Sequence, residues 1–363
     1  MGGRKASGRL SGADRRPRRA PRNRIGALRG RAPSGCEIVS ATAQAAGPPI
    51  RLGVSSCLLG QEVRFDGGHK RDRFLTELLG SFVEWVPVCP EVEVGMGTPR
   101  PALRLVRDGE GEAVRMLEIA SGRDHTRAMQ RYAAQRVRAL GGLELCGYVL
   151  KKDSPSCGMT RVKVYGEKGG ATRDGRGLFA LQLLDAYPNL PVEDEGRLND
   201  ARLRENFIER VFAYKRLRDL FRGRWTPGQL VAFHTAHKLQ LMAHAMEPYR
   251  ELGALVASVK KRAREEVREQ YQDLFMAALA RVATPARNTN VLQHAAGHLK
   301  KGLDSASRTE LAELICDYRR EEVPLVVPLT LLRHHARRLD VSYLNGQTFL
   351  EPHPKELMLR NHV

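Results

Sequence analysis

Three cysteines, Cys57, Cys89 and Cys157, are the side chains whose type and surroundings point most clearly to chemistry. They stand in the strings SSCLLG, VCPEVE and DSPSCG, whose Gly, Pro and Ser residues are typical of tight loops. Thiolates are preferred ligands of soft metal ions and of iron–sulfur clusters. We therefore predict that the three side chains converge on one metal centre, with three ordinary buried cysteines as the alternative.

The distribution of these cysteines along the chain favours a cluster over structural zinc. A structural zinc ion normally has four protein ligands, often with cysteines at close CxxC-type spacing. Here each cysteine is far from the next and occupies its own loop. An iron–sulfur cluster with three cysteine ligands leaves one iron without a protein ligand, and that iron is open to an atom of a substrate.

Short apolar strands are the elements that must position these cysteines. Residues 50–59 (IRLGVSSCLL), 82–90 (FVEWVPVCP) and 143–152 (LELCGYVLKK) each have the composition of a buried strand. Residues 123–140 (RDHTRAMQRYAAQRVRAL) have the apolar spacing of an amphipathic helix. Strands that alternate with helices predict an α/β fold with a Rossmann-like parallel sheet. In such sheets the loops at the carboxyl ends of the strands line the ligand crevice, so the cysteines should meet there.

The second half of the chain is predicted to be all-α. Long amphipathic runs begin with residues 203–221 (LRENFIERVFAYKRLRDLF). Thr226 and Pro227 are a typical helix start before residues 228–246 (GQLVAFHTAHKLQLMAHAM), and we expect Pro248 to close that helix.

Three segments follow from this pattern. Residues 1–48 are rich in Arg, Gly, Pro and Ala without apolar periodicity, which predicts a disordered basic extension. Residues 49–200 are predicted to form the α/β domain and residues 201–363 the helical domain.

Net charge is unevenly distributed over the chain. Residues 1–48 contain 11 Lys and Arg against 2 Asp and Glu, residues 49–201 contain 22 against 21, and residues 202–363 contain 27 against 18. Basic flanks beside a neutral module favour a polyanionic partner, with nucleic acid as the leading candidate. A solvated Arg-rich surface is the alternative.

Composition also indicates where the protein functions. No apolar stretch reaches the roughly 18 residues that a membrane span requires, and no secretory signal precedes the first strand. The six cysteines are scattered, as in proteins of a reducing compartment. We expect a cytoplasmic protein that does not enter a membrane.

Three longer strings resemble a known family. Residues 55–70 (SSCLLGQEVRFDGGHK), 88–101 (VCPEVEVGMGTPRP) and 151–158 (KKDSPSCG) resemble the signature segments of the thiouracil desulfidase family. Residues 197–220 (RLNDARLRENFIERVFAYKRLRDL) and 225–244 (WTPGQLVAFHTAHKLQLMAH) are similar to a second, uncharacterised family that is often fused behind it. The fused arrangement resembles the tRNA 4-thiouridine desulfidases.

The resemblance implies a non-redox enzyme in which Cys57, Cys89 and Cys157 hold a 4Fe-4S cluster. Sulfur would be removed from a thiolated uracil and released as sulfide. Matching the motifs assigns the catalytic carboxylate to Glu91 of CPE and the catalytic serine to Ser154 of SPSC. These types suit the chemistry, since a soft thiocarbonyl sulfur binds an open iron while Glu91 acts as general base and Ser154 positions water or protonates the ring.

Other polar residues near the cysteines have two interpretations each. Asp66 in RFDGGHK either contacts the substrate or forms an Asx turn. Lys152, like Lys70, Lys151 and Arg100, either holds a phosphate of the substrate or is a solvated surface residue.

In the helical domain, His234, His237 and His244 fall on one side of a helical wheel. That arrangement is compatible with a metal site, with a polar face between packed helices, or with contact to nucleic acid. Arg337 and Arg338, which follow two histidines, are a candidate phosphate-binding tip.

Three functions are compatible with these observations. In the first, the enzyme acts on 4-thiouridine in tRNA, and the basic helical domain holds the RNA. In the second, the substrate is a free thiolated base or nucleotide. In the third, the protein is a nucleic-acid-binding sensor that uses its cluster to detect iron or redox state. The basic helical domain favours the first, and Glu91 and Ser154 beside an open iron favour an enzyme over a sensor.

Overall fold

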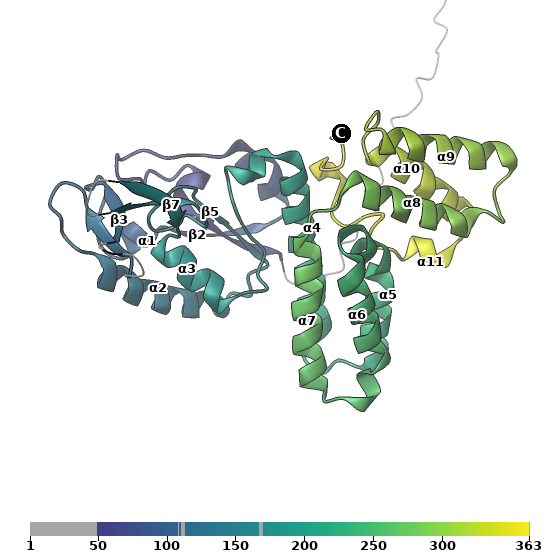
Figure 1. The fold of residues 1–363 in the computed structure, drawn as a ribbon, viewed down its shortest axis with the longest axis horizontal. Coiled ribbons are helices and arrows are strands. Elements are labelled where there is room, and N and C mark those ends of the chain that lie inside the picture. The colour runs from purple at the N-terminus through teal and green to yellow at the C-terminus, as the bar shows by residue number, and fades with distance from the viewer. Residues whose placement is uncertain (1–48, 108, 110–112, 167–169, 363) are drawn as a thin grey trace, which may run out of the picture. The chain divides into compact units, whose positions relative to one another are not determined.

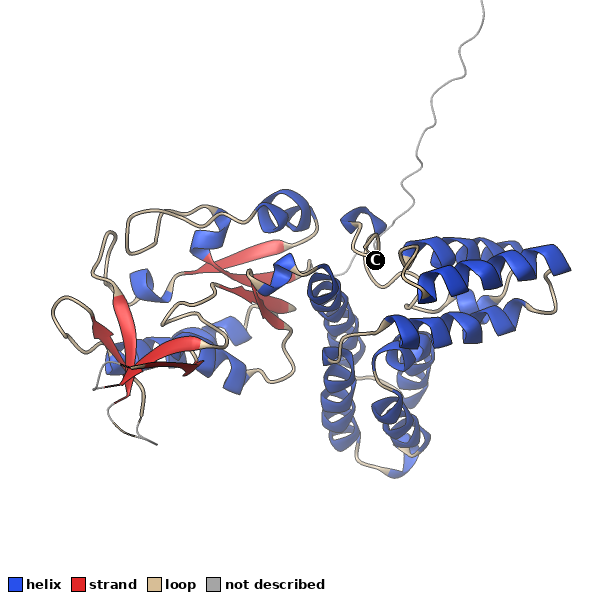
Figure 2. Ribbon diagram, turned by 45° about the horizontal axis from the view of Figure 1, so that its top comes forward, coloured by secondary structure: helices blue, strands red, loops and turns tan. Residues whose placement is uncertain are grey.

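The computed structural model describes residues 49–107, 109, 113–166 and 170–362. These residues belong to one unit. Figures 1 and 2 show its strands in the first part of the chain and its long helices in the second. The basic extension predicted over residues 1–48 lies outside the described residues, and its disorder stays a prediction.

A four-stranded, fully parallel sheet forms the centre of the first domain. Its strand order is β2-β1-β5-β8, with β1 (Arg51–Ser55), β2 (Glu84–Val88), β5 (Gly147–Leu150) and β8 (Val192–Asp194). The three predicted strands are β1, β2 and β5, so the α/β class is confirmed. The short strand β8 was not predicted, because three residues are too few for a detectable alternation.

Helices cover both faces of this sheet. On one face, Tyr148 and Leu150 pack with Val137 of α2 (Thr126–Gly141) and Leu183 of α3 (Leu178–Ala186). On the other face, Leu52 and neighbouring apolar side chains pack against α4 (Ala201–Phe221). Successive residues of a strand point to opposite faces of a sheet. Because both faces are covered here, every residue of β5 is buried, which explains its apolar run.

A second, mixed sheet was not predicted. It has the order β4-β3-β6-β7, with β3 (Leu103–Arg107), β4 (Arg115–Glu118), β6 (Val162–Gly166) and β7 (Ala171–Gly175). Only β3 and β6 pair in parallel, and the other two pairings are antiparallel. Charged residues interrupt these strands, for example in LRLVR and ATRDG, so their periodicity is weak in the sequence. The short helix α1 (Pro90–Glu93) follows β2.

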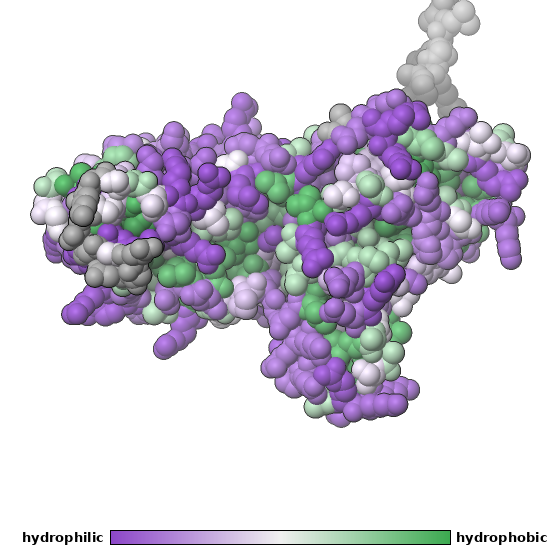
Figure 3. Space-filling view, in the orientation of Figure 1, coloured by the Kyte–Doolittle hydropathy of each residue, from purple (hydrophilic) through white to green (hydrophobic). Residues whose placement is uncertain are grey.

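The remaining chain is helical, as predicted. Its helices are α4 (Ala201–Phe221), α5 (Pro227–His244), α6 (Met246–Ala257), α7 (Arg264–Ala280), α8 (Pro285–Leu299), α9 (Ser305–Arg319), α10 (Val326–Arg338) and α11 (Ser342–Asn345). None of the helices in the described ranges is long and apolar enough to span a bilayer. On the face drawn in Figure 3, hydrophilic side chains are interspersed with smaller apolar patches.

The start of α5 is as expected, but its end is not. The Thr226 hydroxyl accepts a hydrogen bond from the backbone N–H of Gln229 in a capping box, and Pro227 is the first helical residue. Pro248 was expected to close α5, and that prediction is wrong. Instead, α5 ends at His244, and Pro248 lies in the first turn of α6, where its missing N–H has no helical acceptor to lose.

Helix α4 contributes to two cores. Phe207 and Val211 in its first half pack with β1, whereas Leu217 and Phe221 in its second half join the core formed by α5, α6 and α7. The division into domains at residues 200 and 201 stays a prediction, since this helix stabilises both sides of it.

Candidate metal and catalytic site

Cys57, Cys89 and Cys157 line one cavity of about 500 Å³. Cys57 lies just beyond the end of β1, Cys89 directly follows β2, and Cys157 is in the loop after β5. Because these are adjacent parallel strands, their carboxyl ends open onto the same edge of the sheet. The fold thus brings the three thiols together, while their role as ligands stays a prediction.

Local structure orders the first two cysteine loops. Cys57 lies in a 3-10 turn closed by Gly60, whose φ of 92° suits glycine, and its carbonyl accepts hydrogen bonds from Gly60 and Lys70. Cys89 occupies the N-cap position of α1, where its backbone N–H donates to Glu93 Oε1 at 3.0 Å. Both thiols are thus held on hydrogen-bonded backbone.

Ser154 orders the third loop. Its hydroxyl oxygen accepts hydrogen bonds from the backbone N–H groups of Ser156 at 3.2 Å and of Cys157 at 3.1 Å. Ser154 also lines the cavity. No described residue accepts its hydroxyl proton, which leaves that proton for a molecule in the cavity.

Glu91, the predicted catalytic carboxylate, lines the same cavity and is held at both oxygens. Arg100 binds Glu91 Oε2 through Nη2 at 2.6 Å and Nε at 2.8 Å, and the Ser156 hydroxyl donates to Oε1 at 2.8 Å. The Arg100 side chain is only 4% exposed and also donates to the Val63 carbonyl. Arg100 was interpreted as a phosphate ligand or a solvated residue. The structure instead makes it the partner of Glu91.

Burial controls the acidity of the three thiols. It raises the pKa of Cys57 to about 11, although the Lys151 ammonium opposes the shift. Burial likewise raises the pKa of Cys89, and it raises that of Cys157 well above the ordinary value. Cys157 also interacts electrostatically with both other thiols. Bare thiolates are therefore costly here, and a positively charged group that shares their charge would be needed to stabilise them.

The donor types suit an iron–sulfur cluster. Within the described ranges, no three or more Cys, His, Asp or Glu side chains are arranged to hold one metal ion. The cavity between the three thiols has room for a larger group, and soft sulfur donors are the ligands that iron–sulfur clusters use.

Asp66 and Lys152 differ in their placement. Asp66 Oδ1 accepts a hydrogen bond from Gly68 N at 3.1 Å, which lowers the pKa of its carboxyl group, and Asp66 also pairs with Arg64. Of the two interpretations of Asp66, the structure therefore shows the Asx turn. Asp66 is not among the described residues that line the cavity. Lys152 does line it, with its ammonium 4.0 Å from Asp153.

Several lining residues were missed in the sequence. Phe65 lines the cavity although its residue is 43% exposed, and the Arg64 guanidinium lies 5.4 Å from its ring centroid. The Ser55 hydroxyl accepts a hydrogen bond from Lys151 N at 2.9 Å and also bonds the Cys157 sulfur. Ser55 and Phe65 could have been identified from the sequence, because both lie inside the signature string of residues 55–70.

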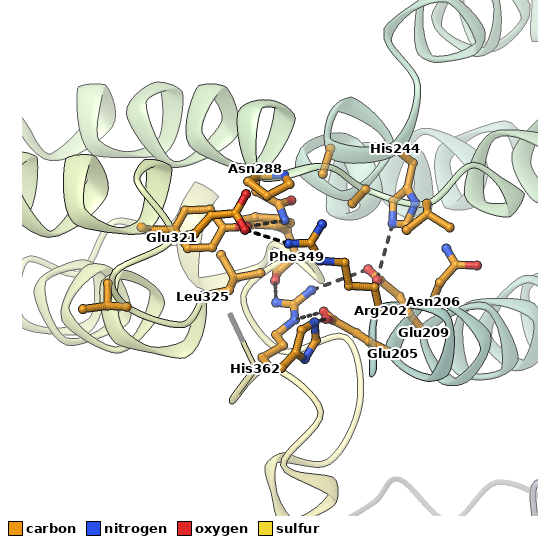
Figure 4. Close-up of a pocket in the computed structure, with 17 residues that line it drawn as sticks. Arg202, Glu205, Asn206, Glu209, His244, Asn288, Glu321, Leu325, Phe349 and His362 are labelled. Carbon is orange, nitrogen blue, oxygen red and sulfur yellow. Dashed lines mark hydrogen bonds and ion pairs between the residues drawn. The ribbon is translucent and has the colours of Figure 1, made fainter. Parts of the chain in front are cut away.

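The histidines of α5 do not form a metal site. His237 is buried and stacks on Phe233 with ring centroids 3.9 Å apart. His244 is buried with its Nε2 atom 3.4 Å from Glu209 Oε2 (Figure 4). For these two residues the packing interpretation holds, whereas His234 is only partly buried.

The cavity of Figure 4 is a second, smaller one, of about 50 Å³, within the helical domain. Its charged side chains satisfy one another. Arg360 Nε lies 2.9 Å from Glu205, its Nη2 lies 3.6 Å from Glu209, and Gln240 donates to Glu209 at 2.8 Å. This network joins the C-terminal segment to α4.

Comparisons with known proteins agree with this division of the chain. A family model described as "2-thiouracil desulfurase" matches residues 52–195, which include every residue that lines the larger cavity. A second model, "Protein of unknown function (DUF1722)", matches residues 238–354.

Two curated proteins are similar to parts of this chain. Uncharacterized protein YbgA of Escherichia coli (strain K12) is 33% identical over 165 residues, which cover 45% of this chain and 98% of YbgA. Uncharacterized protein YbbK of Bacillus subtilis (strain 168) is 32% identical over 151 residues, which cover 40% of this chain and 97% of YbbK.

Among solved structures, the [4Fe-4S]-dependent thiouracil desulfidase TudS is 31% identical, with a TM-score of 0.34, over 42% of this chain and 94% of that chain. Both curated relatives are matched over almost their full length at more than 30% identity. The chain therefore belongs, through residues 52–195, to the 2-thiouracil desulfurase family, joined to a domain of the DUF1722 family over residues 238–354.

Proposed function

We propose that this protein is an iron–sulfur-dependent desulfidase that removes sulfur from 4-thiouridine in tRNA and releases it as sulfide. One observation carries the proposal. Three cysteines from adjacent strand ends line a cavity that also contains Glu91 and Ser154, in the part of the chain that matches the 2-thiouracil desulfurase family.

Cys57, Cys89 and Cys157 would hold a 4Fe-4S cluster. When bound, it would supply a Lewis-acidic iron for the soft thiocarbonyl sulfur of the substrate. Lys151 and Arg64 are close enough to Cys57 to lower its pKa, so they would help to balance the negative charge of the thiolates.

Glu91 would act as the general base. Water adds to the ring carbon, its proton passes to Glu91, the carbon–sulfur bond breaks, and the sulfur leaves as sulfide without net electron transfer. Arg100 and Ser156 would keep the carboxylate oriented toward the cavity, since each binds one of its oxygens. The Ser154 hydroxyl, whose proton has no described acceptor, would donate a hydrogen bond that orients the pyrimidine or the attacking water.

The choice of tRNA is supported by charge. Residues 202–363, which include nearly all of the helical domain, contain 27 Lys and Arg against 18 Asp and Glu. Residues 49–201 are nearly neutral. A basic domain beside a neutral catalytic domain is suited to binding RNA phosphates.

A free thiolated nucleotide is a second candidate substrate. The described residues that line the cavity all lie between Ser55 and Cys157, and none of them belongs to the helical domain. This favours some activity on 4-thiouridine monophosphate even if tRNA is the preferred substrate.

Direct comparison of the two substrates tests the proposal. The anaerobically reconstituted protein would be incubated with thiolated tRNA and with 4-thiouridine monophosphate, while loss of thiouridine absorbance and release of sulfide are followed. We expect turnover of both, with a higher kcat/KM on tRNA. Turnover of the nucleotide alone would replace tRNA by the second candidate, and turnover of neither would reject the desulfidase assignment.

A further inference from the structure

Several aromatic and imidazole rings lie on the helical domain, and three of them are within electrostatic range of Lys238. They come from α5, α6, α8 and α11, which are brought together only by the fold. We call this surface the Lys238 patch, and its members are His234, Lys238, Tyr249, His294, His298 and Tyr343.

The rings of the patch form two groups of ring contacts. The rings of His234 and Tyr249 are parallel to within 1°, with centroids 6.0 Å apart. Those of His294 and His298 are 5.2 Å apart, and that of His298 is 4.6 Å from Tyr343. His294 and His298 are exposed, whereas Tyr249 and Tyr343 are partly buried and pack against the apolar cores of the helical domain.

Lys238 lies within electrostatic range of three of these rings, those of His234, His294 and Tyr343. No carboxylate in the described part of the chain pairs with its ammonium group. The hydroxyl of Tyr343 is shielded from solvent and likewise has no described hydrogen-bond partner. The patch thus combines an unneutralised cation with an unsatisfied polar group.

The imidazoles of His234 and His294 are less readily protonated than a free histidine. Burial, followed by the Lys238 charge, lowers the pKa of His234 to about 4. Burial and then the neighbouring His298 and Lys238 also lower the pKa of His294 below its ordinary value. Planar rings beside a single cation are the combination that single-stranded nucleic acids bind, with bases stacked on rings and a phosphate on the cation.

We propose that the Lys238 patch binds unpaired nucleotides of the RNA substrate, its rings stacking on bases and Lys238 contacting a phosphate. The inference rests on the proposed function for the identity of the RNA. It goes further by locating a contact surface on the helical domain, away from the cysteine cavity of residues 55–157.

Three variants of the full-length holoprotein test this inference. One is Lys238→Glu, the second combines His294→Ala with His298→Ala, and the third combines His294→Tyr with His298→Tyr, which keeps two rings. Lys261→Glu is the matched charge control, because Lys261 is an exposed lysine in the 3-10 turn Val259–Lys261 outside the patch. Binding of thiolated tRNA and of single-stranded oligouridylate would be measured at one salt concentration, with turnover of 4-thiouridine monophosphate as the measure of an intact active site.

We expect Lys238→Glu and the double Ala variant to weaken binding of both RNAs by about tenfold or more, the size expected for lost stacking. The double Tyr variant and Lys261→Glu should bind close to wild type, and all variants should turn over the nucleotide normally. If wild type desulfurates tRNA and the patch variants bind as well as wild type, the patch inference is overturned and the function stands. If wild type binds RNA through the patch without acting on tRNA, the tRNA function is overturned and the patch stands. Absence of RNA binding by wild type would overturn both.

Discussion

Glu91 shows how a side chain of ordinary type becomes specialised by its neighbours. Its two oxygens are bound separately, one by Arg100 and one by the Ser156 hydroxyl. Charge-assisted hydrogen bonds of this kind fix the position of a carboxylate. Ser156, which is fully buried, is therefore a positioning residue for Glu91.

Replacement of Glu91 by Gln should leave the cluster bound but lower turnover by about 10²-fold or more, since an amide cannot accept the proton. Ser156→Ala should lower turnover less, because Arg100 still holds the other oxygen. Steady-state rates, together with iron content, measure both effects. Glu62→Gln, on an exposed carboxylate, is the matched control. Normal turnover by the Glu91→Gln protein would remove Glu91 from the reaction.

The thiols give a prediction about assembly. Changing any one of Cys57, Cys89 or Cys157 to Ala should abolish the visible absorbance of the cluster or the activity, because three thiolates are the minimum set proposed here. Iron and sulfide analysis after anaerobic reconstitution checks this. Cys316→Ala, at an exposed cysteine on α9, should retain both. An intact, active cluster in the Cys89→Ala protein would refute the ligand assignment.

At the scale of elements, α4 and α5 are joined by a buried ion pair. Burial opposes ionisation of Glu209, but the charge and hydrogen bond of His244, with Arg360, hold the pKa of Glu209 well below its ordinary value. Burial likewise opposes a charged His244, yet Glu209 raises the pKa of His244. The pair is therefore charged on both sides in weakly acidic solution.

The pH dependence of the stability that this pair contributes follows from the lowered pKa of Glu209 and the raised pKa of His244. A raised histidine pKa contributes stability that is fully present below the ordinary value of 6.5 and is lost as pH rises through the raised value. A lowered carboxyl pKa contributes stability above the ordinary 4.5 that is lost in acid. Between these values both contributions are present.

We expect the difference in Tm between wild type and Glu209→Gln to be larger at about pH 6 than at about pH 9. Comparison of the two proteins is required because other buried histidines, such as His237 with its pKa of about 3, shift stability in the opposite sense. Glu269→Gln on α7, an exposed carboxylate without a described ion pair, should show no such dependence. A difference that is the same at both pH values would contradict the assigned coupling.

At the scale of the whole molecule, the two domains share apolar contacts. Leu357 and Leu359, near the C-terminus, join Phe207 of α4 in the core that covers β1. A chain that ended at Asp200 would expose this face of the sheet. Point substitutions are therefore better suited than truncation to separating RNA binding from catalysis.

The basic tip of α10 provides such a test. Arg333 pairs with Glu351 at 2.7 Å and its side chain is only 20% exposed, whereas Arg337 is 68% exposed and lies 3.6 Å from the same carboxylate. Arg333 should therefore stay unchanged, because its largely buried side chain pairs with Glu351 and supports the fold of this tip, whereas Arg337 is mostly exposed. Arg337→Glu combined with Arg338→Glu should weaken tRNA binding and lower its salt dependence, with little effect on 4-thiouridine monophosphate.

Binding measured over a series of salt concentrations checks this prediction. The control is Lys300→Glu with Lys301→Glu, an equal charge change at two exposed lysines after α8. Equal loss of activity on both substrates would show that these arginines support the fold or the active site. Unchanged tRNA binding would place the RNA surface elsewhere.

The sequence by itself determined the elements and the positions of the cysteines on them. β1, β2 and β5 are short apolar runs closed by Gly, Pro or Lys, and α5 starts at Thr226 and Pro227, so local composition was sufficient. The parallel order then placed the three thiols at one edge of the sheet. The second sheet was not predicted, because its strands alternate only weakly between apolar and polar residues. The role of Pro248 was predicted wrongly, because a proline is compatible both with the end of one helix and with the first turn of the next.

Only the tertiary structure decided which side chains act on one another. Arg100 and Ser156 meet at Glu91, and His244 meets Glu209, although nothing in their local sequence distinguishes them from solvated residues. The same holds for the rings of the Lys238 patch, which come from four helices. The physical reason is that hydrogen bonds, burial and pKa shifts depend on contacts between segments distant in sequence, whereas strand and helix formation depends largely on neighbours along the chain.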